Sequence, residues 1–260
     1  MTFDRLKWTY RAWRYRQRLE RQEIRLLLRH LAAGDVAVDV GAHKGAYTYW
    51  MRRAVGASGK VYAFEPQPSL AAGLRALAAG SGFDNVVVEN LGLSSAAGTL
   101  TLNVPGGGPS PGASFEPSRS ALPAAQSYPV PVTTLDAYFR GADRSADRSA
   151  DQHMDWGRIR LLKCDAEGHE LEVFRGGEGL LTEVRPCLLF ECEQRHRGSG
   201  SVDEVFRWLQ NLGYQGYFVA KSGPRDIAEF DPRLHQADHE ASGYVNNFLF
   251  LPAARRGQAA

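Results

Sequence analysis

From residue 36 onward, short apolar segments alternate with longer helix-like segments, and this alternation constrains the fold more than any other feature. The segments VAVDV, KVYAFE, NVVVEN, RIRLLKCD and RPCLLFEC predict strands, whereas AYTYWMRRAV, PSLAAGLRALAAG, HELEVFRGGEGLL and SVDEVFRWLQNLGY predict helices. Strands that alternate with helices form βαβ units and a mostly parallel sheet. The sequence therefore predicts one doubly wound α/β domain, in which YQGYFVA and GYVNNFLFLP close the sheet as an antiparallel pair.

Two segments interrupt this pattern. After a short extra strand, GTLTLN, residues 105–131 hold many Pro, Gly and Ser without a period, which predicts a long loop. The stretch YPVPVTTLD is then expected to be extended as it re-enters the fold. Residues 141–155 contain a tandem ADRS repeat, and such low complexity predicts a mobile surface insertion. We therefore place the α/β domain at residues 34–252 and a separate extension at residues 1–33.

The N-terminal extension is strongly basic, and residues 5–32 predict a single helix. Residues 1–30 carry nine Lys/Arg and three Asp/Glu, so a charge of +6 falls there and the rest of the chain sums to −4. We favour a helix that packs on its own acidic domain or on a second subunit. A helix on an anionic membrane stays open, because interfacial helices combine Trp and Leu with Arg. Nucleic acid is not expected as a partner, because no known binding motif accompanies the charge.

Composition indicates a reduced, cytoplasmic protein. The three cysteines form neither a CxxC pair nor a zinc-binding spacing, and an odd number favours free thiols. The charged, aromatic N-terminus lacks the apolar region of a signal peptide. No stretch approaches the roughly 18 apolar residues that a membrane-spanning helix needs.

The segment DVGAHKG forms a turn directly after the first predicted strand. Ligands of open α/β sheets bind at the carboxyl ends of the strands. Gly41 allows backbone to approach a ligand closely, and Gly45 allows the next helix to pack tightly. The turn lacks the G-x-G-x-x-G pattern of dinucleotide sites and the Gly-Lys-Ser/Thr of phosphate-binding loops. Asp39, just before the turn, can hold the turn amides or a ligand amine.

Glu65 ends the second strand, 24 residues after Gly41. An acid at this place can accept hydrogen bonds from both ribose hydroxyls of a nucleoside. A glycine turn, an adjacent Asp and a Glu that binds ribose suit a nucleoside with a cationic amino-acid tail. This combination predicts S-adenosylmethionine as the cofactor, bound by four residues: Asp39, Gly41, Gly45 and Glu65.

A second acidic cluster follows later strands. Asp165 and Glu191 are expected at adjacent strand ends, where they form a carboxylate pair that faces the cofactor. Such a pair can take a proton from a hydroxyl, bind a divalent ion such as Mg²⁺ or Mn²⁺, or hold the substrate. Glu167 near a helix start is either part of this site or a helix cap. His169 and His196 are further candidates for a base.

At these residues the sequence resembles the FkbM-type family of S-adenosylmethionine-dependent methyltransferases. The resemblance rests on an ordered set of segments: DVGAHKG, VYAFEPQP, VENLGLSSAAGTLTL, VTTLD, LLKCDAEGHELEVFRGG, RPCLLFECEQRH and VNNFLFLP. It implies a Rossmann-like class I methyltransferase sheet and methyl transfer, usually to a hydroxyl of a sugar, glycolipid or natural product. By position, Asp165, Glu167 and Glu191 match the second acidic site of the family. His43 stands where the family more often has Asn.

The expected function is therefore O-methylation, with Asp165 as the first candidate for the base and Glu191 in support. Two alternatives from other classes stay open. One is a dinucleotide-dependent oxidoreductase, which the broken glycine pattern disfavours. The other is a non-catalytic binding protein built on a methyltransferase fold, because a fold alone does not fix a function.

Overall fold

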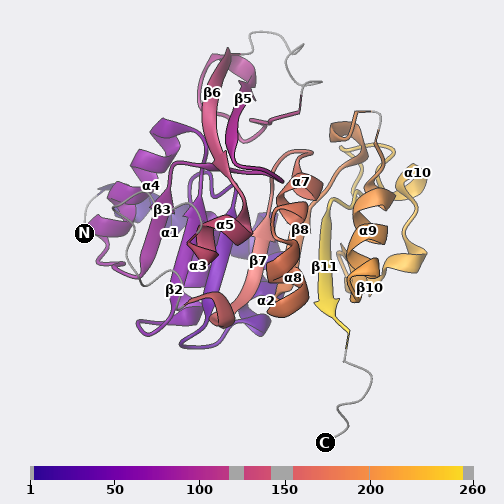
Figure 1. Ribbon diagram of the computed structural model, residues 1–260, viewed down its shortest axis with the longest axis horizontal. Coiled ribbons are helices and arrows are strands. Elements are labelled where there is room, and N and C mark those ends of the chain that lie inside the picture. The colour runs from indigo at the N-terminus through magenta and orange to yellow at the C-terminus, as the bar shows by residue number, and fades with distance from the viewer. Residues whose placement is uncertain (1–2, 117–125, 142–154, 199, 254–260) are drawn as a thin grey trace, which may run out of the picture.

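A large, mostly parallel sheet forms the centre of the molecule (Figure 1). The computed structural model describes residues 3–116, 126–141, 155–198 and 200–253 of the 260. Among these, the sheet has eight strands in the spatial order β10 (Gly223–Asp226), β9 (Tyr214–Ala220), β11 (Asn247–Pro252), β8 (Cys187–Glu191), β7 (Ile159–Cys164), β1 (Val36–Val40), β2 (Lys60–Phe64) and β3 (Val86–Glu89).

The order of the strands confirms the doubly wound prediction. Strand β1 pairs in parallel with β2 on one side and with β7 on the other, so the chain reverses its direction of travel across the sheet at this point. Strand β11 lies antiparallel between β8 and β9, which confirms the predicted antiparallel closure. Strand β10, which the sequence did not predict, extends that edge by an antiparallel pair with β9.

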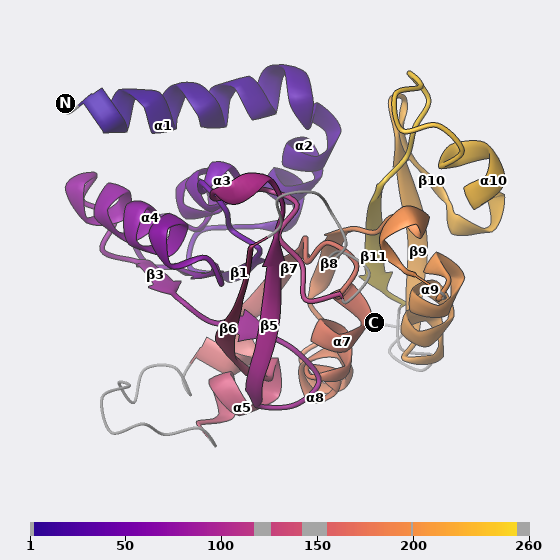
Figure 2. The ribbon, with the colours of Figure 1, turned by 90° about the horizontal axis from the view of Figure 1, so that it is seen from above.

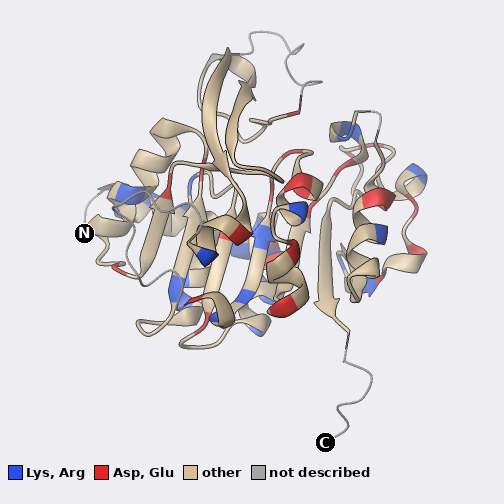
Figure 3. Cartoon of the chain, in the orientation of Figure 1, with Lys and Arg blue, Asp and Glu red and all other residues tan. Residues whose placement is uncertain are grey.

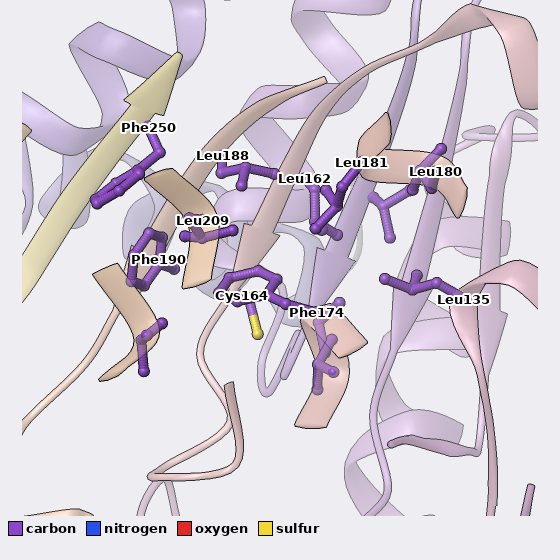
Figure 4. Close-up of a cluster of buried hydrophobic side chains, with 14 of the residues drawn as sticks. Leu135, Leu162, Cys164, Phe174, Leu180, Leu181, Leu188, Phe190, Leu209 and Phe250 are labelled. Carbon is purple, nitrogen blue, oxygen red and sulfur yellow. The ribbon is translucent and has the colours of Figure 1, made fainter. Parts of the chain in front are cut away.

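Helices cover both faces of the sheet, because both faces are apolar. Strand β1 illustrates this. Val36, Val38 and Val40 pack into one core, whereas Ala37 between them packs into the other. The first core contains aromatic and aliphatic side chains of the strands and of the covering helices, some of which Figure 4 shows. Its helices are α5 (Leu135–Arg140), α7 (Glu170–Arg175), α8 (Glu178–Glu183) and α9 (Val202–Asn211). The second core is covered by α1 (Phe3–Arg14), α2 (Arg21–His30), α3 (Ala46–Val55) and α4 (Pro68–Gly80).

A separate three-stranded sheet rises beside the carboxyl edge of the large one. Its order is β4 (Gly92–Leu93), β6 (Gln126–Thr133) and β5 (Gly98–Val104). The predicted loop over residues 105–131 was therefore too long, because residues 126–131 belong to β6. Pro129 and Pro131 suggested a loop, but they precede the two residues of β6 that pair with β4. Along that stretch one side of β6 is an edge, and an edge strand tolerates proline.

The predicted single N-terminal helix was wrong, because the helical axis bends at Glu20. Helix α1 continues into a π-helical turn over Tyr15–Leu19, and α2 starts only after Glu20. The backbone of Glu20 is not helical, with φ of −132° and ψ of 54°. We call residues 3–30 the N-terminal arm; Figure 2 shows how it lies across α3 and then bends toward the sheet.

The arm packs on its own domain mainly through aromatic contacts and not through the charge pairing that the sequence suggested. The Trp8 ring is 1% exposed, and its centroid lies 5.5 Å from Tyr49 and 5.4 Å from Phe83. The Trp8 indole nitrogen donates to the Gly45 carbonyl at 2.7 Å, and the Trp50 indole nitrogen donates to the Ala12 carbonyl at 2.8 Å. Ile24 and Leu27 of α2 are also fully buried.

Two further expectations concern the periphery. The ADRS repeat lies in residues 142–154, outside the part of the chain that the structure describes. A search of the described helices finds none with the length and apolar character required to cross a bilayer.

We expect Trp8→Ala to lower the free energy of unfolding by about 3–5 kcal/mol, the usual cost of removing a large buried aromatic side chain. Denaturant unfolding followed by circular dichroism would measure the change. Tyr10→Ala is the matched control, because Tyr10 lies on the same helix and is exposed; its effect should stay within about 0.5 kcal/mol. Equal losses in the two variants would contradict the packing described for α1.

Candidate active site

A cavity lies where β1, β2, β7 and β8 end. It encloses about 1150 Å³ of space free of protein atoms, part of which is open to solvent. Strands β1 and β7, which flank the reversal in strand order, end at its floor, and ligands of open α/β sheets bind at such a point. Six residues that the sequence singled out border it: Gly41, His43, Glu65, Asp165, Glu167 and Glu191.

Close contacts within the protein explain both glycines of the turn after β1. At Gly41, φ is +72°, and a Cβ atom would lie 1.9 Å from the carbonyl oxygen of Asp165. At Gly45, φ is also +72°, and a Cβ atom would lie 2.3 Å from a methyl group of Leu74. Gly45 therefore permits tight helix packing, as expected. The neighbour that excludes a side chain at Gly41 is a backbone carbonyl of the β7 loop, and the expected approach to a ligand remains a prediction.

Glu65 fastens the glycine turn to the end of β2. One carboxylate oxygen accepts the His43 N–H at 2.7 Å, and the other accepts the Gln67 N–H at 2.9 Å. Each oxygen keeps a second lone pair for a ligand. Glu65 is 2% exposed, and this burial raises the pKa of its carboxyl group to about 7. The side-chain amide of Gln67 forms two further hydrogen bonds, both 2.9 Å long, with the backbone of Ser110 in the cavity wall.

Lys163 holds a buried positive charge between β1 and β7. It lies opposite Asp39 in the register of the two strands. Its ammonium nitrogen lies 3.3 Å from Asp165 Oδ2 and 3.9 Å from Asp39 Oδ1. Burial alone would lower the pKa of Lys163, but the carboxylates of Asp165, Asp39 and Glu20 raise it above its ordinary value. Lys163 is therefore an ammonium ion at neutral pH, which excludes it as a base and fits it to orient Asp165.

The N-terminal arm adds residues to the cavity that no sequence pattern indicated. Tyr15 and Glu20 both border it. The Tyr47 hydroxyl, in the first turn of α3, donates a hydrogen bond to the Glu20 carboxylate. Burial raises the pKa of Glu20 to about 7. Only the break in the helix at Glu20 turns this carboxylate inward, and one acidic residue in a basic segment carries no recognisable signal of such a role.

Asp165 and Glu191 both border the cavity, but their environments differ. The Asp165 side chain is 31% exposed and is paired with Lys163. Burial, together with the charges of Asp165 and Glu167, raises the pKa of Glu191 well above its ordinary value. This environment favours the protonated form of Glu191, which can donate a hydrogen bond. Asp165, which is more exposed and hydrogen-bonded to Lys163, is the better candidate of the two for accepting a proton.

The histidine candidates lie behind the wall of the cavity and do not border it. His169 is held between the Ser94 hydroxyl and the Glu116 carboxylate, both at 3.0 Å. His196 lies 3.1 Å from the Glu167 carboxylate. Neither histidine is therefore among the residues that border the cavity, and Glu167 lies beside the His196 ring.

Glu170, which the sequence analysis did not single out, caps the loop beside Glu167. Its carboxylate accepts the N–H groups of Ala166 at 3.1 Å and Gly168 at 3.0 Å. These bonds stabilise the loop before α7, and the N-terminus of α7 has no side-chain cap hydrogen bond from Glu167 or any other described residue. As for metals, the described residues contain no group of three or more His, Cys, Asp or Glu side chains placed to hold an ion.

Comparison with known proteins identifies the domain. A family model described as the methyltransferase FkbM domain matches residues 39–215. The chain belongs to the FkbM methyltransferase family. It is therefore an S-adenosylmethionine-dependent methyltransferase, and the strand order described above is its Rossmann-like sheet. A search of curated proteins finds no match.

Several solved structures are similar to this FkbM-family chain. A methyltransferase FkbM from Methylobacillus flagellatus is 12% identical with a TM-score of 0.49, and the match covers 96% of this chain and 55% of that one. This chain thus spans about half the length of that protein. A methyltransferase from Aquifex aeolicus is 16% identical with a TM-score of 0.48 and coverages of 96% and 98%. A protein from Streptococcus mutans in complex with S-adenosylhomocysteine is 10% identical with a TM-score of 0.46 and coverages of 88% and 94%.

The residues at the glycine turn of this FkbM-family chain fit S-adenosylmethionine. Within the described part of the chain, Asp39 Oδ1 and His43 Nε2 are buried and make no hydrogen bond. Burial also lowers the pKa of His43 to about 4, so its ring is neutral and can accept or donate one bond. His43 and Glu65 border the cavity and offer polar atoms to a ligand, whereas the fully buried Asp39 does not border it and accepts a hydrogen bond from Thr48. Their roles in binding remain predictions.

We expect Glu20→Gln to become increasingly stabilising as the pH rises. Glu20 binds its proton more tightly in the folded protein, with a pKa of about 7, than in the unfolded chain, with a pKa near 4.5. Loss of this proton therefore lowers the free energy of unfolding of the wild type as the pH rises between these values, whereas Gln has no proton to lose. The variant should match the wild type at about pH 4.5 and exceed its free energy of unfolding by about 1–3 kcal/mol at about pH 8.

Urea unfolding at a series of pH values would measure this difference. Glu178→Gln is the control, because Glu178 is exposed on α8 and its substitution should give a difference that does not change with pH. A difference that is equally flat for Glu20→Gln would contradict the buried environment described for Glu20.

Proposed function

We propose that this enzyme methylates a hydroxyl oxygen of a sugar, glycolipid or natural product. The observation that carries the proposal is the partly exposed Asp165 carboxylate, fixed by Lys163 at the floor of the cavity. Sugar and alcohol hydroxyls are poor nucleophiles at neutral pH, so their methylation needs a base near the reacting oxygen. A carboxylate in this position suits oxygen as the acceptor atom.

The bound cofactor supplies an electrophilic methyl group on a positively charged sulfur. In the proposed reaction, Glu65 binds the ribose hydroxyls, and Asp39 with the glycine turn binds the tail. Asp165 accepts the proton of the acceptor hydroxyl. Glu191, whose burial favours its protonated form, donates a hydrogen bond that holds the acceptor oxygen or Asp165 in place. Most of the acceleration then comes from proximity and alignment of the two reactants.

Among the alternatives, the family match and the broken glycine pattern disfavour an oxidoreductase. A divalent ion held by Asp165 and Glu191 is a different proposal for the same two residues. It predicts that a chelator abolishes activity and that magnesium or manganese restores it. Activity that survives the chelator would favour Asp165 as a base.

We expect Glu65→Ala to weaken binding of S-adenosylhomocysteine about 5- to 150-fold. The variant loses two hydrogen bonds to ribose, and each contributes roughly 0.5–1.5 kcal/mol or more when the acceptor is ionised. Isothermal titration calorimetry would measure the affinity. Glu178→Ala, far from the cavity, should bind like the wild type. Unchanged affinity in Glu65→Ala would remove Glu65 from the cofactor site.

We expect Asp165→Asn to lower kcat about 10²- to 10⁴-fold, because Asn has no basic oxygen to accept the proton. Binding of S-adenosylhomocysteine should change little, which separates loss of chemistry from loss of the cofactor. Mass spectrometry of lysate glycans and lipids with isotope-labelled cofactor would first identify the acceptor and then measure its turnover. Asp203→Asn, in the exposed first turn of α9, is the control. Full activity of Asp165→Asn would place the base elsewhere.

A further inference from the structure

Exposed apolar side chains gather on the N-terminal arm. Among the described residues, five large hydrophobic side chains are exposed, and four of them lie between residues 6 and 19. These four are Leu6, Tyr10, Trp13 and Leu19, with Tyr10 at 71% exposure; the fifth, Leu234, lies elsewhere. Scattered exposed hydrophobic residues need no explanation, but a concentration within one short segment indicates an interaction surface.

The geometry of α1 places three of the four on one stripe. Leu6, Tyr10 and Trp13 follow the spacing i, i+4, i+7, which puts them on one side of an α-helix. Trp8 and Ala12 lie on the opposite side and are buried against the domain. Figure 2 shows α1 at the outer edge of the molecule, with the rest of the chain on one side of it. Leu6 and Tyr10 therefore face away from the protein, whereas Trp13 is 43% exposed and also packs edge-on against Trp50, with ring centroids 5.0 Å apart.

The N-terminal arm is also strongly basic. Arg14, Arg18, Arg21, Arg25 and Arg29 are exposed on the arm, and in the described part of the chain none of them forms an ion pair with a carboxylate. Acidic side chains instead occupy α7, α8 and α9, which cover the other face of the sheet (Figure 3). The arm is thus a basic and partly apolar part of the surface, and an anionic plane would attract it.

We propose that the outer surface of the arm docks on an anionic lipid bilayer. This docking surface comprises the four exposed apolar residues and the five exposed arginines of the arm named above. Tyr and Trp favour the interface between lipid and water, Leu gains from burial in the acyl region, and Arg pairs with lipid phosphates while its stem stays apolar. The inner side of the same arm contributes Tyr15 and Glu20 to the cavity, so docking brings the cavity next to the bilayer.

Charge and polarity favour the bilayer over two other occupants. A symmetric dimer through this surface would place two sets of arginines against each other, and like charges at an interface cost several kcal/mol. A nucleic acid would pair with the arginines but would leave the stripe of Leu6, Tyr10 and Trp13 without a role. An anionic bilayer complements both parts of the surface.

Sedimentation with lipid vesicles tests the proposal on the full chain. We expect binding to vesicles of equal parts phosphatidylglycerol and phosphatidylcholine, and little binding to pure phosphatidylcholine. Arg14→Gln/Arg18→Gln should weaken binding about fivefold for each arginine removed. Leu6→Ser/Tyr10→Ser should weaken it at least about tenfold, since two apolar side chains no longer enter the bilayer. Leu234→Ser removes the exposed leucine outside the arm and should bind like the wild type.

Two measurements keep the test decisive. Circular dichroism establishes that each variant is folded, and quenching of Trp13 fluorescence by brominated lipid, absent in Trp13→Phe, reports insertion without any destabilising change. Equal binding to anionic and neutral vesicles, or wild-type binding by Leu6→Ser/Tyr10→Ser, would overturn the proposal. So would a dimer in solution that this double variant dissociates, or binding to duplex DNA that is tighter than binding to the vesicles. None of these outcomes depends on methyl transfer.

Discussion

The buried ammonium group of Lys163 is the interaction on which the arrangement of the cavity depends. Burying a charge is costly unless it is compensated. Two carboxylates pair with Lys163, and a third attracts it from a longer distance. Asp39 comes from β1, Asp165 from the loop after β7, and Glu20 from the arm. One cation therefore joins the turn that follows the first strand, the predicted catalytic loop and the N-terminal arm.

Around this cation, chemically similar groups take different protonation states because their surroundings differ. Glu20 and Glu65 have a pKa of about 7, so small changes in charge nearby shift their ionisation. Burial and neighbouring carboxylates raise the pKa of Glu191 well above its ordinary value. Asp165 is more open to solvent and sits beside the ammonium. A cavity with this many acidic groups is suited to a ligand that carries positive charge, as a sulfonium does.

The sequence predicted the sheet well because its signals are local. The runs at β1, β2, β7 and β8 are short, apolar and followed by Gly or acidic residues, so both the strands and the residues at their ends were placed correctly. The stretch YPVPVTTLD was correctly expected to be extended, as β6 shows over residues 128–133. The start of β6 was nevertheless assigned to a loop, and the bend at Glu20 was missed, because both depend on distant contacts. Pro129 is tolerated in β6 because one side of the strand is a free edge at that position. The backbone of Glu20 leaves the helical conformation where the folded domain places the Tyr47 hydroxyl and the Lys163 charge near its carboxylate. Glu170 was missed for the same reason, since its cap bonds need the folded loop.

Glu20 belongs to the arm and to the cavity at the same time, and this shared residue couples the two thermodynamically. Suppose that a ligand gains binding free energy from contact with the Glu20 carboxylate. Because linkage is reciprocal, binding of that ligand stabilises the docked arm by the same free energy. The contact of Trp8 with the Gly45 carbonyl extends that coupling to the backbone of the glycine turn. Binding of such a ligand in the cavity therefore makes the arm more resistant to proteolysis.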